Sequence, residues 1–150
     1  MDIQNTIIGV VLALICAIPF ILFYISKKKQ KQTLLNTLNT VAQKHNATIT
    51  TFEIFNTSII AIDTVNNLAF YIKNNESTVV NLKETEHCFL NVKHNNKNVI
   101  ISADICFKHL SNQEGSFNVY DEAQDPPLNG ETIFSKKWVN TFNKHIKIAA

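Results

Sequence analysis

The strongest feature of the hydrophobic pattern is an uninterrupted apolar stretch over residues 7–25, which contains no charged residue. A helix rises about 1.5 Å per residue, so these nineteen residues span about 29 Å, the thickness of the hydrocarbon core of a bilayer. A soluble helix would instead carry a single apolar stripe. The stretch therefore predicts a transmembrane helix. Pro19 is tolerated because a lone span can satisfy its backbone groups in lipid only as a helix.

Charge around this stretch predicts its orientation. Residues 1–6 contain no Lys, whereas four lysines follow the stretch directly. Because basic residues stay on the cytoplasmic side, we expect a short extracytoplasmic N-terminus over residues 1–6 and a cytoplasmic C-terminal part. The predicted location is the inner (plasma) membrane, crossed once, with the lipid bilayer as a partner that also attracts the basic flank. The orienting residues are Lys27, Lys28, Lys29 and Lys31.

Two cleaved alternatives compete with this uncleaved anchor. A secretory signal needs a basic segment before the apolar run and a small-residue cleavage site after it, and neither is present. A lipid-modified Cys16 needs a small residue before it, where the chain has Ile15. The chain has three cysteines without a spacing pattern, which is typical of free thiols in a reducing compartment.

The segment 26–46 joins the basic flank to a second helical pattern over residues 32–45. Apolar residues in this pattern recur at the spacing of one helical face. The helix either continues the span or breaks near Ser26, and it ends at Asn46, where Asn accepts a left-handed cap. Its apolar face must cover either its own domain or a second copy of itself. The residues of this face are Leu34, Leu35, Leu38, Val41 and Ala42.

Residues 47–150 change to a β pattern that ends in a helix, which gives an α+β class. Short runs rich in β-branched and aromatic residues alternate with Asn-rich turns such as Asn66-Asn67. After them, Phe134, Trp138, Phe142 and Ile146 lie four residues apart, as on one face of a helix. The seven strands are predicted over residues 48–55, 58–63, 68–73, 77–83, 86–94, 99–109 and 116–121.

Seven strands followed by one amphipathic helix is an order that resembles the pleckstrin-homology (PH) superfold, as found in small membrane-anchored bacterial proteins. Residues 60–72 are similar to the second hairpin of such domains, and residues 117–121 and 131–138 to their closing strand and helix. The resemblance implies one curled, seven-stranded antiparallel sheet or barrel. It also implies that the C-terminal helix plugs the open end of this sheet through Phe134, Trp138 and Phe142.

The same resemblance bears on ligands. Family members that bind phosphoinositides hold the phosphates with basic residues in the first loop, but residues 55–58 contain none. No phosphoinositide-type headgroup site is therefore expected. The superfold also serves as a protein-interaction module, and a fold alone does not choose between these functions.

Composition excludes several other functions. The net charge is +2, but from residue 32 onward ten Lys face eleven Asp and Glu, a net charge of −1, so we expect no nucleic-acid partner. Three glycines cannot build a phosphate-binding loop, and no hydrolase signature is present. His87, Cys88, Cys106 and His109 are metal-ligand types, but alternation along strands separates them, so neither a metal site nor a cofactor is expected.

The functional expectation is a membrane-anchored, non-enzymatic module for protein interaction or scaffolding, with a protein partner at the membrane. Two alternatives stay open. The first is an oligomeric envelope component assembled through the helix 32–45. The second is an enzyme whose site uses scattered acids with His87, His94 or His109.

Overall fold

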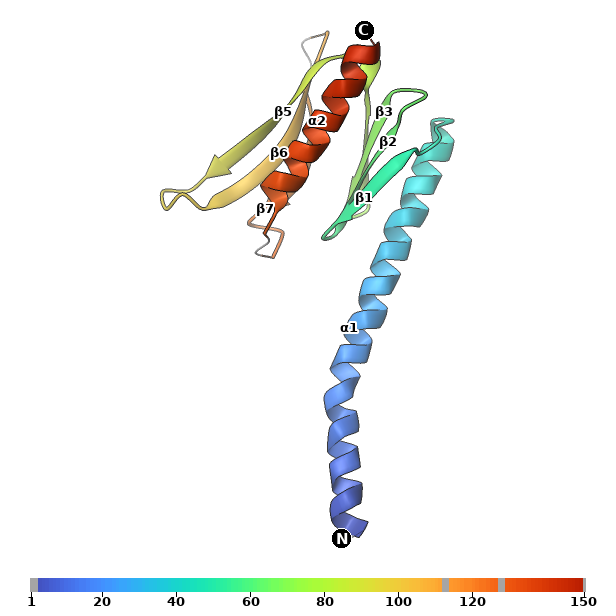
Figure 1. The fold of residues 1–150 in the computed structure, drawn as a ribbon, viewed down its shortest axis with the longest axis vertical. Coiled ribbons are helices and arrows are strands. Elements are labelled where there is room, and N and C mark those ends of the chain that lie inside the picture. The colour runs from blue at the N-terminus through green and yellow to red at the C-terminus, as the bar shows by residue number, and fades with distance from the viewer. Residues whose placement is uncertain (1–2, 112–113, 127–128, 150) are drawn as a thin grey trace.

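The computed structural model describes residues 3–111, 114–126 and 129–149, and it has the predicted α+β class (Figure 1). A long helix is followed by seven antiparallel strands and a C-terminal helix, in the predicted order. Residues 1–2 of the predicted N-terminal segment, and residues 112–113, 127–128 and 150, lie outside the described residues. The elements are α1 (Ile3–Lys44), β1 (Thr51–Phe55), β2 (Ser58–Asp63), β3 (Leu68–Lys73), β4 (Glu76–Asn81), η1 (Leu82–Glu84), β5 (Thr85–His94), β6 (Ile100–His109), β7 (Glu114–Asp121) and α2 (Glu131–Ala149).

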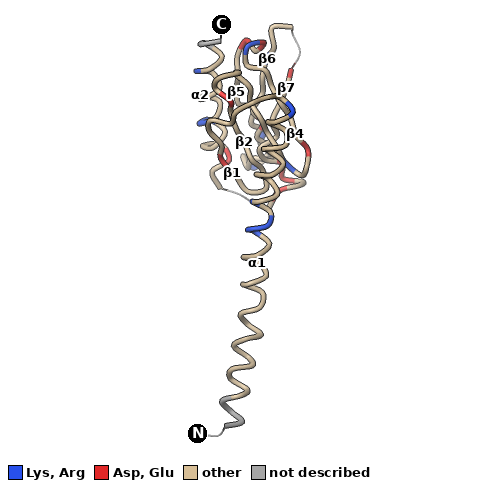
Figure 2. Tube along the Cα trace, turned by 90° about the vertical axis from the view of Figure 1, so that its right-hand side faces the viewer, with Lys and Arg blue, Asp and Glu red and all other residues tan. Residues whose placement is uncertain are grey.

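Helix α1 joins the apolar stretch and the segment 32–45 into one uninterrupted helix of 42 residues, which includes Pro19. Of the two arrangements left open by the sequence, the helix therefore continues past Ser26. Figure 2 shows it as a stem that carries the rest of the chain at one end. It ends where Asn46 adopts a left-handed conformation (φ 50°), as the cap prediction requires.

Asparagine supplies the left-handed backbone conformation at most of the turns. Asn74 and Asn75 both have positive φ (51° and 65°) and connect β3 to β4 in a two-residue hairpin. This pair of conformations matches the right-handed twist of the flanking strands, which explains the tight connection. Asn56 and Asn67 act similarly in the preceding two turns, with φ of 51° and 57°. Asn residues thus set the register of the first four strands.

The prediction of a single curled or closed sheet is wrong. The strands form a four-stranded sheet with the order β1-β2-β3-β4 and a three-stranded sheet with the order β5-β6-β7, and the sheets are not closed. The 3₁₀ turn η1 separates β4 from β5 and buries Leu82, so β5 starts a new sheet. Helix α2 covers one side of the domain (Figures 1 and 2), where its aromatic face joins the core that the two sheets share.

The two central strands of the four-stranded sheet, β2 and β3, are buried on both faces, which is why residues 59–62 and 68–72 form apolar runs rather than alternating patterns. One face joins α2 and the three-stranded sheet in a shared core that includes Ile60, Phe107 and Phe117. The other face packs against α1. This contact answers the question that the sequence left open, because the apolar face of the 32–45 segment covers its own domain. Its buried residues are Leu34, Leu38, Val41 and Ala42.

Candidate functional site

A polar cavity of about 360 Å³ opens between the β3–β4 hairpin and β7, where the two sheets face each other without pairing. The side chains at its floor come from the inner face of β3 and from β7. Its rim comes from β4 and from the turn after β7. Its lining includes Tyr71, Lys73, Glu76, Asn118, Asp121 and Gln124.

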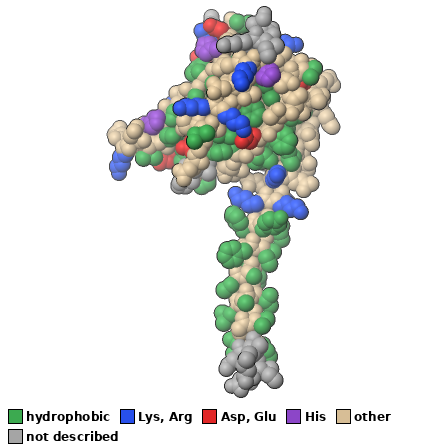
Figure 3. All heavy atoms as spheres, viewed as in Figure 1, with side chains coloured by type: hydrophobic (Ala, Val, Ile, Leu, Met, Phe, Trp, Pro, Cys, Tyr) green, Lys and Arg blue, Asp and Glu red, His purple; other side chains and the backbone are tan. Residues whose placement is uncertain are grey.

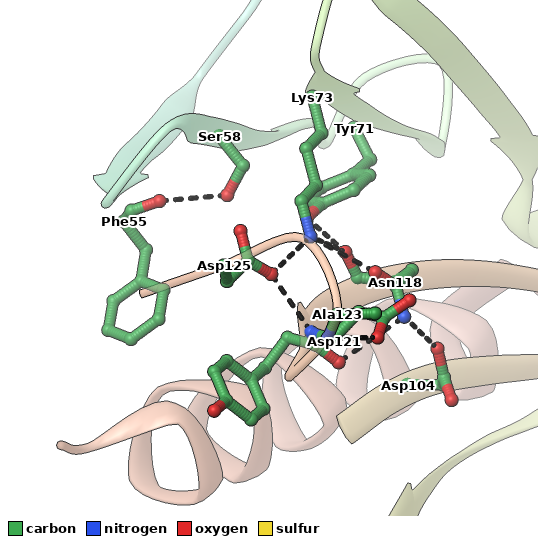
Figure 4. A network of polar contacts seen from close by, with 10 residues as sticks. Phe55, Ser58, Tyr71, Lys73, Asp104, Asn118, Asp121, Ala123 and Asp125 are labelled. Carbon is green, nitrogen blue, oxygen red and sulfur yellow. Dashed lines mark hydrogen bonds and ion pairs between the residues drawn. The ribbon is translucent and has the colours of Figure 1, made fainter. Parts of the chain in front are cut away.

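The centre of this site is a buried ion pair. The Lys73 ammonium lies 2.6 Å from a carboxylate oxygen of Asp125, and the two side chains are only 9 % and 4 % exposed. The ammonium also donates to the side-chain oxygen of Asn118 at 3.0 Å and to its backbone oxygen at 3.3 Å. All three Lys73 protons therefore have acceptors, as a buried ammonium requires. Figure 4 shows this convergence.

Neighbouring polar groups hold Asn118 in place. Its side-chain amide donates to Asp104 at 2.8 Å, and its backbone oxygen also accepts the hydroxyl of Tyr71. Burial raises the pKa of Tyr71 well above its usual value. A contact with Ser58 opposes this change, and the negative charges of Asp125 and Asp104 add to it. The phenol is therefore protonated at neutral pH and acts as a hydrogen-bond donor.

Local turns place the two charges next to each other. Lys73 is the last residue of β3 and precedes the Asn74-Asn75 turn, so its side chain lies at the end of the sheet. After β7, the backbone N–H of Asp125 donates to the Asp121 oxygen at 2.8 Å. The Asp125 carboxylate in turn accepts the Asp121 N–H at 2.9 Å. This closed turn aims the carboxylate back at β3.

The arrangement braces the two sheets against each other. A saturated ammonium and a protonated phenol offer no activated nucleophile or base. The network instead ties β3, β7 and the turn before α2 together across the cavity. What remains open to a ligand is the polar rim, which carries the carboxylates of Glu76 and Asp121.

Sequence reasoning missed Lys73, Asp125 and Asn118. The ion pair joins residues 52 positions apart, and no spacing rule marks such a pair. One signal was available, because Lys73 ends an otherwise apolar strand and a buried lysine needs a partner. The acids Asp104, Asp121 and Asp125 follow no spacing pattern in the sequence that marks them as a site.

The cysteines and histidines considered as metal ligands do not converge among the described residues. Cys88 points into the core, and burial together with the charge of nearby Cys106 raises its pKa to about 12. Cys106 lies on the opposite face, because Cys88 pairs with Phe107 in the ladder. His87 lies beside Phe89, 5.5 Å between ring centroids.

The aromatic residues of the C-terminal helix lie in the shared core. Phe134, Trp138 and Phe142 are all buried, and Phe134 stacks on Phe55 at 4.5 Å between ring centroids. The Trp138 indole N–H donates to the carboxylate of Glu53 on β1 at 3.0 Å. The one polar atom of this buried indole therefore has a hydrogen-bond partner.

The four predicted orienting lysines belong to α1 and follow its apolar stretch. Figure 3 shows basic side chains gathered on the stem next to the β domain. They occupy different faces of the helix. Lys29 lines a pocket with the turns of the four-stranded sheet and shares a second groove with Lys28, while Lys27, Lys28 and Lys31 border a third groove. The Lys27 ammonium also lies 5.5 Å from the ring centre of Phe23.

Within the described residues, α1 is the one helix long and apolar enough to cross a membrane, and its apolar window is fully exposed. A signal sequence near an N-terminus meets the same criteria of length and composition. No protein-family model, no curated protein and no solved structure matches the chain.

Proposed function

We propose that the protein crosses the inner (plasma) membrane once and holds a small, non-enzymatic binding module on the cytoplasmic side, with its N-terminus outside. The continuity of α1 carries this proposal. The same helix contains a stretch that fits a bilayer and, further along, the face that packs on the four-stranded sheet. The four lysines behind the stretch support the orientation.

The stem supports a fixed placement of the module. Leu34 follows Ile25 by only nine positions, which is about 14 Å of helix. No flexible linker intervenes, so the same side of the module faces the bilayer at all times. Such a tether raises the effective concentration for a partner that lies at the same membrane.

The edge of β5 supports a protein as the partner. Asn143 of α2 accepts the N–H of Cys88 at 2.9 Å and donates to its C=O at 2.7 Å, as a paired strand would. These groups point away from β6. By alternation, the backbone groups of Leu90 and Val92 point to the same side, further along the strand. Figure 1 shows the β5–β6 hairpin extending past α2 there. An extended segment of a partner can add to this edge.

The PH-like fold belongs to the same proposal. The order of the seven strands and the C-terminal helix supports it, as does the buried aromatic face of α2. In this proposal the Lys73–Asp125 network braces the module, because its charges and hydrogen bonds are already paired.

A substitution at Val92 tests the edge. Proline removes the N–H that points outward and spares the bonds to β6, so the module stays folded and loses strand addition. A photoreactive residue at the exposed Lys93 should yield a discrete protein adduct in native membranes. We expect Val92→Pro to remove this adduct and the matched Val92→Ala to retain it. An adduct that survives Val92→Pro with unchanged yield refutes the β5 edge as the binding surface.

A further inference from the structure

Charge is divided unevenly between two parts of the module, although residues 32–150 together carry a net charge of only −1. Residues 132–150, which cover α2 after its first residue, hold four lysines and no acidic residue. Residues 74–82 and 110–126, which include β4 and β7, hold five acidic residues and no lysine. The module therefore has a basic part and an acidic part.

The basic part presents one exposed side of α2. Lys136, Asn140 and Lys144 are exposed and lie four residues apart, so they share one side of the helix, which we call the basic face. Among the described residues, neither Lys136 nor Lys144 has an ion-pair partner, whereas Lys137 pairs with Glu53. The two unpaired ammonium groups are free to meet carboxylates of another molecule.

The acidic part lies where β4 and β7 run next to each other without pairing. Thr78 of β4 and Asn118 of β7 line the same cavity, which Glu76 borders. Glu76, Glu114 and Glu122 are exposed at the start of β4, at the start of β7 and directly after β7. We call these three carboxylates the acidic face.

The two faces lie on opposite sides of the module. Figure 2 shows α2 on one side of the domain and β4 with β7 on the other. Helix α2 runs in about the same direction as α1, with its first turns nearer the apolar stretch (Figure 1). Glu76 is also at this end, because it follows the Asn74-Asn75 turn, which lines a pocket with Ser26 of α1. Lys136 and Glu76 thus lie toward the membrane on opposite sides.

This arrangement favours a neighbouring copy over the bilayer as the partner of the basic face, an inference that rests on the proposed span. Lys136 and Lys144 are separated by about 12 Å along α2, whereas the polar layer of a bilayer is about 5–8 Å thick. Copies that cross one membrane share one orientation, so the basic face of one stands level with the acidic face of the next. The shared membrane raises their effective concentration, which lets individually weak exposed pairs act together.

We propose that the module associates with a second copy of itself, with the basic face of one copy against the acidic face of the next. Lys136 meets Glu76 at the end nearer the membrane, and Lys144 contributes further out. The contact joins two different faces, so each copy keeps a free face for another neighbour and a row can form along the membrane.

The test measures energy transfer between copies of the full chain in vesicles of phosphatidylcholine. Each copy carries a donor or an acceptor dye on a tag before Met1, away from both faces. Lys136→Glu and Glu76→Lys each replace attraction by repulsion, so each should lower the transfer at least about fivefold. A mixture of the two variants again has complementary faces and should recover most of the wild-type transfer. Lys44→Glu is the matched control, because it makes the same charge change at an exposed residue of α1, and it should keep the wild-type transfer.

Wild-type transfer at the level of randomly placed copies overturns the proposal. Equal losses for Lys136→Glu and Lys44→Glu also overturn it, as does a mixture that stays at the level of the single variants. A loss of transfer when phosphatidylglycerol replaces a minor share of the phosphatidylcholine identifies anionic lipid as the occupant of the basic face, and overturns the second copy.

Two further measurements separate this proposal from the proposed function. Val92→Pro blocks the β5 edge but leaves both charged faces intact, so the transfer should stay unchanged; a loss of transfer would place the contact at β5 and overturn the charged faces. Extraction of the wild-type chain by alkaline carbonate overturns the span, and with it the shared orientation of the copies.

Discussion

The buried Lys73–Asp125 pair yields the sharpest stability prediction. Asp125→Asn keeps the size of the side chain and removes its charge, so an ammonium that is 9 % exposed loses its counter-ion. Asn118 continues to accept two of its protons. Removing one partner of a buried pair costs about 3–5 kcal/mol, because an uncompensated charge remains in the interior. We expect a loss of this size in the free energy of unfolding.

Urea unfolding of the full chain in detergent micelles measures this loss. Trp138 is the single tryptophan and is 2 % exposed, so its fluorescence reports the core around α2. For a urea dependence of about 1–3 kcal/mol per molar, the midpoint should fall by about 1 M or more. Glu86→Gln is the control, because its pair with Lys108 leaves both side chains 40–50 % exposed, and its midpoint should stay at the wild-type value.

The double variant Lys73→Met/Asp125→Asn separates lost charge balance from lost packing. Without the ammonium, no buried charge is left unpaired, so most of the stability should return. A single-variant loss below about 1 kcal/mol refutes the reasoning. So does a double variant that is as unstable as the single one.

Three further predictions concern other parts of the chain. Leu38→Ala, at a position only 2 % exposed, should weaken the packing of α1 on the sheet by about 2–5 kcal/mol and speed proteolysis of the loop after α1, as followed on gels. Burial raises the pKa of Asp63, but N–H groups led by that of Asn66 outweigh it and hold the pKa below its usual value. Its stabilisation is complete above about pH 4 and is lost as the pH falls through the lowered pKa, so Asp63→Asn should flatten the decline of Tm between about pH 4 and 2. Burial raises the pKa of the Cys88 thiol to about 12, so iodoacetamide should modify the partly exposed Cys106 first, and mass spectrometry should find equal modification only after unfolding.

The sequence was sufficient for the features that depend on local pattern. An uncharged stretch of bilayer length defines a helix by composition alone, and the Asn-rich turns separated strands whose order the structure confirms. Asn74-Asn75 shows why, since both residues adopt the left-handed conformation that Asn tolerates well. Such signals act within a few residues and need no tertiary contact.

The features that sequence reasoning missed depend on contacts between distant segments. The division into two sheets follows from η1 and from the core that α2 shares with both sheets, and neither is visible in strand patterns. Lys73 and Asp125 looked like an ordinary strand-end lysine and a loop acid until the fold brought them together. Lys29 entered the sequence analysis only as one of four equivalent lysines. Its distinct position appeared when the continuous helix set one of its faces against the turns.

Fusions at Ala150 in intact cells test most directly whether α1 crosses the membrane and holds the module inside. Green fluorescent protein folds to its bright form in the cytoplasm, whereas alkaline phosphatase becomes active outside it. We predict a fluorescent fusion that stays in the membrane fraction at the full length of the chain, and an inactive phosphatase fusion. An active phosphatase, or a mature protein shortened to begin after Ile25, would contradict the account.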